Sequence, residues 1–80
     1  MEYLLGEIEL FAFGYAPIDY RLCNGDILQI TQNSALYSLI GNKFGGNGST
    51  TFALPNMLND TPVLGMNYYI CVAGYYPTRS

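Results

Sequence analysis

The sequence predicts a small α+β domain of short antiparallel strands, one helix and long loops rich in Gly and Asn. Three observations support this prediction. Apolar residues alternate at period two near the start, they recur at helical spacing near residues 33–41, and Gly, Asn and Pro punctuate the rest. A chain of 80 residues is too short to build two separate cores. We therefore expect one domain over residues 1–80.

The first expected strand covers residues 7–13, where successive side chains point to opposite faces. One face carries Ile8, Leu10 and Ala12, and we expect it to be core. The other carries Phe11 and Phe13 beside two glutamates. That mixture suits a strand that something else partly covers.

Two turns follow. Residues 14–20, which include Ala16-Pro17, are expected to form the first. Asn24-Gly25-Asp26 separates the apolar residues 22–23 from residues 27–30. Asn and Gly tolerate positive φ, so this tripeptide predicts a tight turn.

The helix is expected at about residues 33–41. Thr31 or Asn33 can cap its start, and Gly41 is placed to end it. Its apolar stripe consists of Leu36, Leu39 and Ile40, with Tyr37 at the edge. A helix this short is unstable alone, so packing must hold it.

The remaining chain alternates loop and strand. The Gly- and Asn-rich residues 41–51 are expected to form tight turns, since they lack the Gly-Lys-Ser/Thr ending of a phosphate-binding loop. Residues 52–54 form a short apolar piece before Pro55. Residues 68–75 are rich in aromatic and β-branched residues and predict the last strand.

Composition points to assembly. Charged residues make up 11% of the chain, against about 25% in ordinary soluble domains. Half of the residues are hydrophobic and eight are Tyr. We expect other copies of the chain to cover part of this surface, with residues 1–6 as an exchangeable N-terminal arm. The expected subunit interface consists of Tyr3, Leu4, Leu5, Phe11, Phe13, Tyr68, Tyr69, Tyr75 and Tyr76.

Charge and residue inventory argue against several function classes. A net charge of −3 with three basic residues disfavours nucleic acid and anionic membranes, and no apolar run is long enough to span a bilayer. The first residues do not resemble a cleavable secretory signal. Without His there is no catalytic triad within the chain, and the two cysteines do not form a zinc motif. We expect no catalytic residues, no metal and no cofactor.

Two features leave alternatives open. Cys23 and Cys71 could bond within the chain, link neighbouring subunits or stay as buried thiols. The tyrosines at positions 68, 69, 75 and 76 could form a platform for a cell-surface glycan. Subunit contact is the better interpretation of these tyrosines, because Tyr is enriched at interfaces generally.

Several strings together resemble the phage tail collar domain family, which includes the so-called microcystin-dependent proteins. Residues 5–12 and Leu22-Cys-Asn-Gly-Asp-Ile-Leu are similar to its opening. The string Phe44-Gly-Gly-Asn-Gly-Ser-Thr-Thr-Phe-Ala-Leu-Pro-Asn is similar to its centre, and residues 69–79 to its terminal strand. The resemblance implies a small tail-collar-like α+β domain of tail fibres and extracellular appendages, often trimeric, with a structural role.

The chain departs from the family pattern at three places. Tyr20 stands where Trp is common, and Asn56-Met-Leu-Asn-Asp replaces the usual Asp-Leu-Arg-Gly-Arg. The long variable insert that family members usually carry before Tyr68 is reduced to Met66 and Asn67. Since such inserts display variable surface, its loss favours a scaffold over a receptor-binding role.

The sequence therefore predicts a structural, self-assembling subunit of an extracellular filament or fibre. Its copies would join by strand addition or exchange and by contacts rich in Tyr and Phe. The alternatives are a phage tail-fibre or collar module that forms a closed trimer, and a carbohydrate-binding module. The expected location is an extracellular appendage or a phage-tail-like particle.

Overall fold

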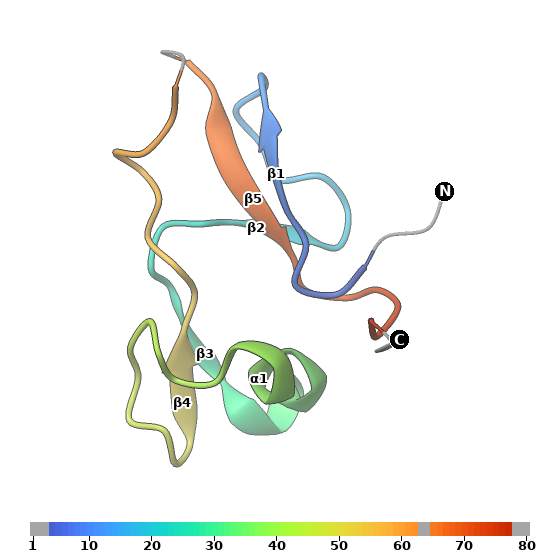
Figure 1. Ribbon diagram of the computed structural model, residues 1–80, viewed down its shortest axis with the longest axis vertical. Helices are drawn as coiled ribbons and strands as arrows, with labels where there is room; N and C mark the ends of the chain where they lie inside the picture. The colour runs from blue at the N-terminus through green and yellow to red at the C-terminus, as the bar shows by residue number, and fades with distance from the viewer. Residues whose placement is uncertain (1–3, 63–64, 78–80) are drawn as a thin grey trace.

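The computed structural model describes residues 4–62 and 65–77, and Figure 1 shows their arrangement. The elements in chain order are β1 (Ile8–Phe11), β2 (Tyr20–Leu22), β3 (Ile27–Gln29), the 3₁₀ turn η1 (Ile30–Gln32), α1 (Ser34–Ile40), β4 (Thr51–Ala53) and β5 (Asn67–Cys71). All strand pairs between them are antiparallel. The predicted α+β class is confirmed.

The strands form two separate sheets. In the larger one β5 lies between β1 and β2, in the order β1-β5-β2, and in the smaller one β3 pairs with β4. Ile8 of β1 and Arg21 of β2 both lie opposite Ile70 of β5. The last strand of the chain is thus the central strand of the larger sheet, which makes β1 and β2 its two edges.

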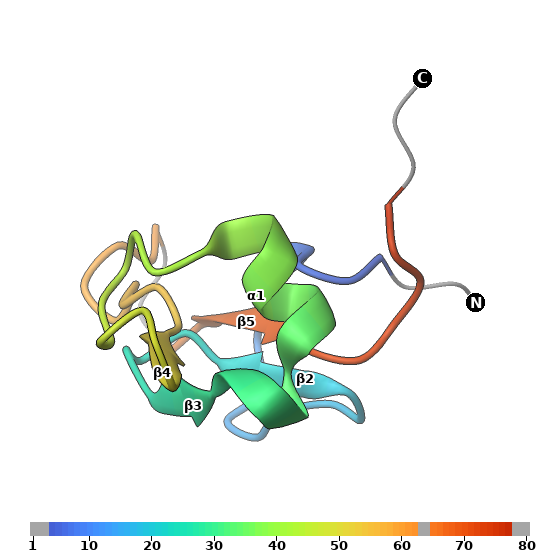
Figure 2. The ribbon, with the colours of Figure 1, turned by 90° about the horizontal axis from the view of Figure 1, so that it is seen from below.

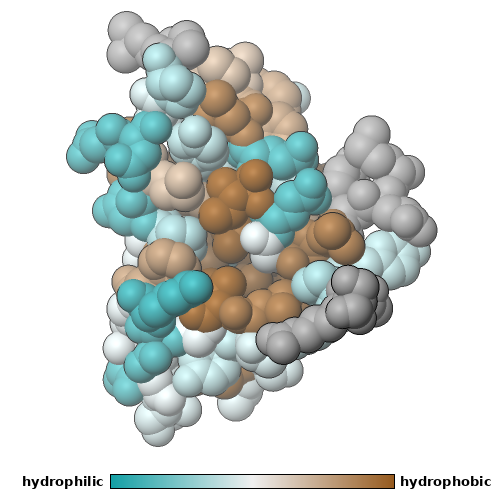
Figure 3. Space-filling model, viewed as in Figure 1, coloured by the Kyte–Doolittle hydropathy of each residue, from teal (hydrophilic) through white to brown (hydrophobic). Residues whose placement is uncertain are grey.

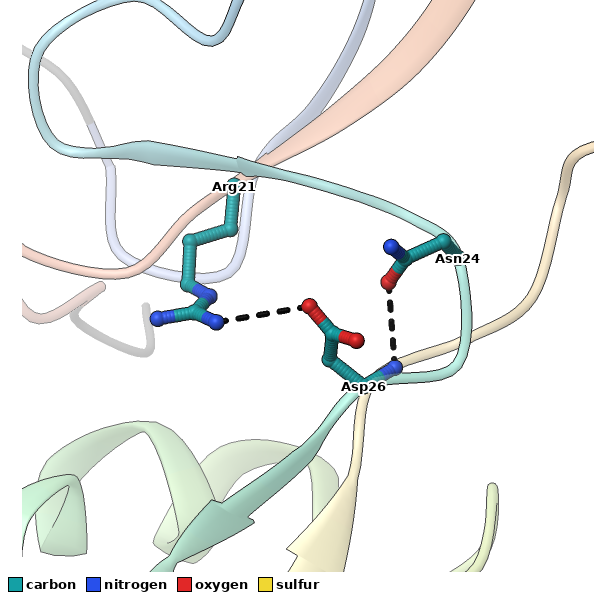
Figure 4. Close-up of polar contacts among 3 residues, drawn as sticks. All are labelled: Arg21, Asn24 and Asp26. Carbon is teal, nitrogen blue, oxygen red and sulfur yellow. Dashed lines mark hydrogen bonds and ion pairs between the residues drawn. The ribbon is translucent and has the colours of Figure 1, made fainter.

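The predicted turn at Asn24-Gly25-Asp26 joins the two sheets (Figure 4). The side-chain Oδ1 of Asn24 accepts a hydrogen bond from the Asp26 amide at 3.1 Å, and Gly25 has a φ of +84°. Arg21 reaches back across this turn to the Asp26 carboxylate at 3.3 Å. The strands that flank the turn therefore pair with different partners and do not form a hairpin.

Helix α1 occupies Ser34–Ile40, within the predicted range of 33–41. It ends at Gly41, whose amide donates to the Tyr37 carbonyl at 2.7 Å. At its start Asn33 holds the N-cap position, but its side-chain amide donates to the Gln29 carbonyl instead of capping the helix. Leu36 is buried, and Tyr37, Leu39 and Ile40 pack against the same cluster, as the apolar stripe predicted.

The core has two parts, on opposite faces of β5. Ile70 points into an aliphatic cluster with Leu36 of α1 and Phe52 of β4, and Figure 2 shows α1 lying over this side. Tyr69 points to the other face and packs with Tyr20 and Cys71 in a smaller aromatic cluster. Adjacent strand residues face opposite sides, so both faces of the sheet carry apolar groups.

The expected core face of the first strand is wrong. Ile8 is 38% exposed, Leu10 is half-buried and Ala12 is exposed, whereas Phe11 on the other face packs against Tyr20 and Tyr69. The reason is position in the sheet. Since β1 is an edge strand, the aliphatic cluster buries Ile70 of the central strand but does not extend over β1.

The loop of residues 41–50, here called the glycine loop, closes through one side chain. Asn47 Oδ1 accepts hydrogen bonds from the amides of Ser49, Thr50 and Thr51 at 2.8–3.0 Å. Gly46 has a φ of +87°, and a Cβ there would lie 2.4 Å from the Phe52 Cα. The glycines therefore permit tight turns. The Asn47 oxygen occupies the backbone amide donors that a bound anion would otherwise need.

Candidate interaction surface

The structure divides the nine residues of the expected subunit interface. Tyr3 lies outside the described residues. Leu5 and Tyr69 are 6% and 2% exposed and belong to this chain's own core. Phe11 and Tyr68 are half-buried against the two clusters. Four positions are exposed, and they are Leu4, Phe13, Tyr75 and Tyr76.

Phe13 belongs to a row of stacked rings, here called the aromatic row, made of Phe11, Phe13 and Tyr15. The centroids of Phe11 and Phe13 lie 5.1 Å apart, and those of Phe13 and Tyr15 lie 4.8 Å apart. Phe11 anchors the row by an edge-on contact with Tyr20 at 5.6 Å. Exposure rises along the row, to 38% at Phe13 and 70% at Tyr15. The row thus leads from the aromatic cluster out to the surface.

The hydroxyls of two tyrosines next to the aromatic row form hydrogen bonds to β1 and the segment that follows it. Tyr69 donates to the Phe13 carbonyl at 3.1 Å, which ties the segment after β1 back onto β5. Tyr20 donates to the Glu9 carboxylate at 3.0 Å. Burial, and then this hydrogen bond beside a negative charge, raise the pKa of Tyr20. The phenol therefore stays protonated and remains a donor.

Leu4, Tyr75 and Tyr76 form a second exposed apolar group, where the two ends of the chain meet. Leu4 forms an isolated parallel β-bridge with Tyr75, and the Leu5 amide donates a hydrogen bond to the Tyr75 carbonyl at 2.8 Å. The Tyr76 hydroxyl lies 2.8 Å from the Ser38 hydroxyl on α1. The described part of the expected arm, residues 4–6, is therefore docked on this chain's own C-terminal segment.

Hydrophobic side chains also gather on the face seen in Figure 3, between the three-stranded sheet and α1. Hydrophilic residues line the left margin of this view. An apolar zone bordered by polar residues on one side is found on surfaces that contact another protein.

Tyr15 and Ile18 are exposed residues that lie outside the expected interface, because residues 14–20 predict only a turn. Ile18 is 86% exposed. The sequence does contain a signal for their exposure, which is the absence of charge. Residues 10–18 contain no charged side chain in a chain whose surface has few to spare. A stretch without charged residues exposes apolar side chains, here those of Tyr15 and Ile18.

The tyrosines considered for a glycan platform do not share a surface. Tyr68 and Tyr69 are neighbours in β5, so they point to opposite faces, and Tyr69 is buried. Tyr75 and Tyr76 lie beyond the strand, near the N-terminal segment and α1. The four rings cannot stack on one sugar chain in this arrangement.

Cys23 and Cys71 are free, buried thiols that lie in different clusters. The disulfide within the chain is therefore not formed in this structure. Burial raises the pKa of Cys23 to about 11, and burial also raises that of Cys71. Thiols held protonated in the core react slowly with oxidants and with other thiols.

Residues 4–62 and 65–77 form no pocket and no group of three side chains able to hold a metal ion. Among these residues no helix is long and apolar enough to cross a membrane.

Comparison with known proteins gives the family. The model of the Phage Tail Collar Domain matches residues 6–62, a stretch that runs from before β1 to beyond β4 and ends before β5. A search of curated proteins found no match. The matched stretch contains the turn at residues 24–26, α1 and the glycine loop. The chain belongs to the phage tail collar domain family, a structural family, and membership implies a structural role in phage tail fibres.

Proposed function

We propose that this chain is a self-assembling structural subunit of a tail fibre or a related extracellular filament, and that copies join through apolar contacts and strand addition. The observation that carries the proposal is the aromatic row. Stacked rings are rigid, so they lose little side-chain entropy on binding, and they bring large apolar area to a contact. The chain has few charged side chains to keep its exposed apolar residues solvated, so contact with another copy is the main way to bury them.

The row is supported from below, as a contact surface needs to be. Phe11 lies against Tyr20 and Tyr69, and the Tyr69 hydroxyl fixes the backbone at Phe13. A partner that meets Phe13 and Tyr15 therefore meets side chains already placed. Preorganisation of this kind lowers the entropic cost of association.

The direct test is electron microscopy and sedimentation of the purified chain over a concentration series. We expect wild type to assemble and the double variant Phe13→Ala, Tyr15→Ala to lose assembly. Phe44→Ala is the matched control, because Phe44 is a comparably exposed ring outside the row. Monomers at every concentration would contradict self-assembly. Equal assembly by both variants would remove the row from the mechanism.

A collar module that forms a closed trimer on a larger fibre is the second candidate, and membership of the phage tail collar domain family supports its place in a tail fibre. The same measurements separate the two. A filament grows in length with concentration, whereas a closed particle keeps a fixed mass of three chains. Reductant should change neither, since both thiols are buried.

A further inference from the structure

The outer edge of β1 is open. The Cys71 amide donates to the Glu7 carbonyl at 2.8 Å, which fixes the alternation of hydrogen bonds along the β1–β5 pair. In an antiparallel pair, Glu9 and Phe11 then direct their backbone groups to β5, and Ile8 and Leu10 direct theirs away from it. Across residues 4–62 and 65–77, no hydrogen bond is formed to the outward N–H or C=O groups of Ile8 and Leu10.

The opposite edge of the same sheet is closed by its own chain. The Tyr20 amide donates to the Pro17 carbonyl at 3.0 Å, and the Leu22 carbonyl accepts from the Asn24 amide at 2.9 Å. The Arg21 side chain extends from this strand to Asp26, as Figure 4 shows. Tight turns on both sides of β2 thus occupy groups that a further strand would need.

The edge of β1 also lacks two of the usual devices against pairing, because natural edge strands often carry proline or lysine and β1 has neither. β1 is Ile-Glu-Leu-Phe, and the carboxylate of its charged residue, Glu9, accepts a hydrogen bond from Tyr20 in the same sheet. Apolar side chains flank the edge on both faces, with Ile8 on one and Phe11 of the aromatic row on the other.

We propose that the outer edge of β1 pairs antiparallel with β1 of a second copy, so that the two three-stranded sheets join across a two-fold axis. This inference rests on the proposed self-assembly and names its first step. A second copy suits the edge because it supplies the same apolar flanks. Residues that pair across a two-fold axis lie on the same face, so the apolar Ile8 and Leu10 meet apolar residues of the second copy.

Charge selects the register. If Ile8 lay opposite Leu10 of the second copy, Glu9 would lie directly opposite Glu9, and like charges in that position destabilise a strand pair. If Leu10 lies opposite Leu10, Glu9 falls beside Phe11 of the other copy. We therefore infer the register centred on Leu10.

This pairing closes on itself. It uses the β1 edge of both copies, and the β2 edges at the two ends of the joined sheet are already bonded to their own turns. Edge pairing therefore stops at the dimer. Growth into a fibre must use another surface, such as the aromatic row or the exposed Leu4 and Tyr75.

Cross-linking tests the register. Leu10→Cys places two thiols opposite each other at a Cα separation of about 5.5 Å, within the range that a disulfide spans. Glu9→Cys places them on a diagonal of about 7–8 Å, too far for efficient bonding. With oxidised glutathione as the oxidant, we expect a covalent dimer from Leu10→Cys and little from Glu9→Cys. The reverse result would overturn the register, and a dimer from neither variant would overturn the pairing.

Sedimentation of the full chain tests the edge. Ile8→Lys puts a charge on each of the two paired strands and should raise the dimer dissociation constant by about a hundredfold or more. Ile27→Lys is the control, because Ile27 is an exposed apolar strand residue in the other sheet. Circular dichroism of both variants confirms that they fold.

The outcomes separate this inference from the proposed function. If wild type assembles and Ile8→Lys assembles equally well, the edge pairing is overturned and self-assembly stands. If wild type stays monomeric at every concentration, both are overturned, and the edge would be left for a strand of a different fibre protein.

Discussion

The two halves of this molecule are held in place differently, one mainly by backbone conformation at glycines and the other mainly by aromatic packing. The helical half, made of β3, α1, the glycine loop and β4, surrounds Phe52 and Leu54, which are fully buried. Its turns depend on glycines with positive φ and on the side chain of Asn47. The sheet half, made of β1, β5 and β2, has a thinner cluster and exposes Ile8 and Tyr15. In the proposed assembly the helical half therefore acts as a scaffold, and the sheet half presents the contact surface.

The largest effect should come from a single methyl group in the scaffold. Gly46→Ala puts a Cβ 2.4 Å from the Phe52 Cα and 2.7 Å from the Thr51 carbonyl oxygen, both backbone atoms that cannot move aside cheaply. We expect a loss of more than about 4 kcal/mol in the free energy of unfolding, enough to unfold a small domain. Urea denaturation followed by circular dichroism measures it.

Gly41→Ala is the matched control for this change. Gly41 also has positive φ, at +62°, but a Cβ there would meet nothing within 4 Å. It should cost only the backbone strain, about 1–3 kcal/mol. Equal losses in the two variants would show that strain, and not the contact with Phe52, makes Gly46 necessary.

The second effect should come from Asn47, which holds three amides of the glycine loop. Asn47→Ala leaves those amides without their acceptor and should cost about 2–3 kcal/mol, at about 1 kcal/mol for each hydrogen bond. Asn47→Asp keeps an acceptor oxygen and should lose less. Thermal melts of the two variants give the comparison, and an equal loss would contradict the acceptor role.

The sequence predicted the helical half better than the sheet half. Leu36, Gly41 and the turn at Asn24-Gly25-Asp26 act locally, because a stripe, a helix end and a turn depend on neighbours in the chain. The partners of β1 lie some sixty residues away, in β5. Alternation in residues 7–13 showed that two faces exist, but not which face the core covers.

The candidate surface was predicted only in part, for the same physical reason. Composition predicts Phe13 and the tyrosines as contact residues, yet Tyr69 is core because β5 is the central strand. No local pattern says that a strand near the C-terminus will lie between the first two. The open edge of β1 depends on the same long-range pairing, so it is visible only in the fold.

The third effect concerns pH and the buried thiol of Cys23, which packs in the same cluster as Leu36 and Phe52. Burial raises the pKa of Cys23 from 9.0 to about 11, so the folded chain holds this proton more tightly than the unfolded chain. Its contribution to stability is fully present below about pH 9 and is lost as pH rises toward 11.

Cys23→Ala should remove this dependence. Between pH 9 and 10.5 the wild-type free energy of unfolding should fall more steeply than that of the variant, by up to about 1.4 kcal/mol per pH unit. Cys71 and Tyr20 of the sheet half also have raised pKa values, so some slope should persist in the variant. Parallel curves from urea denaturation would exclude Cys23 as a titrating group.

The smallest effect should be in the sheet half, where one hydroxyl ties the aromatic row to β5. Tyr69→Phe keeps the buried ring and removes the hydrogen bond to the Phe13 carbonyl, which should cost about 1 kcal/mol. Tyr15→Phe is the control, since the exposed Tyr15 ring should lose almost nothing in stability. The two changes should differ more in assembly. Without its tether the segment at Phe13 gains freedom that a partner must remove, so Tyr69→Phe should weaken sedimenting assemblies by about fivefold to tenfold. If assembly were unchanged while stability fell, the row would be packing for its own chain and not a prepared contact for another.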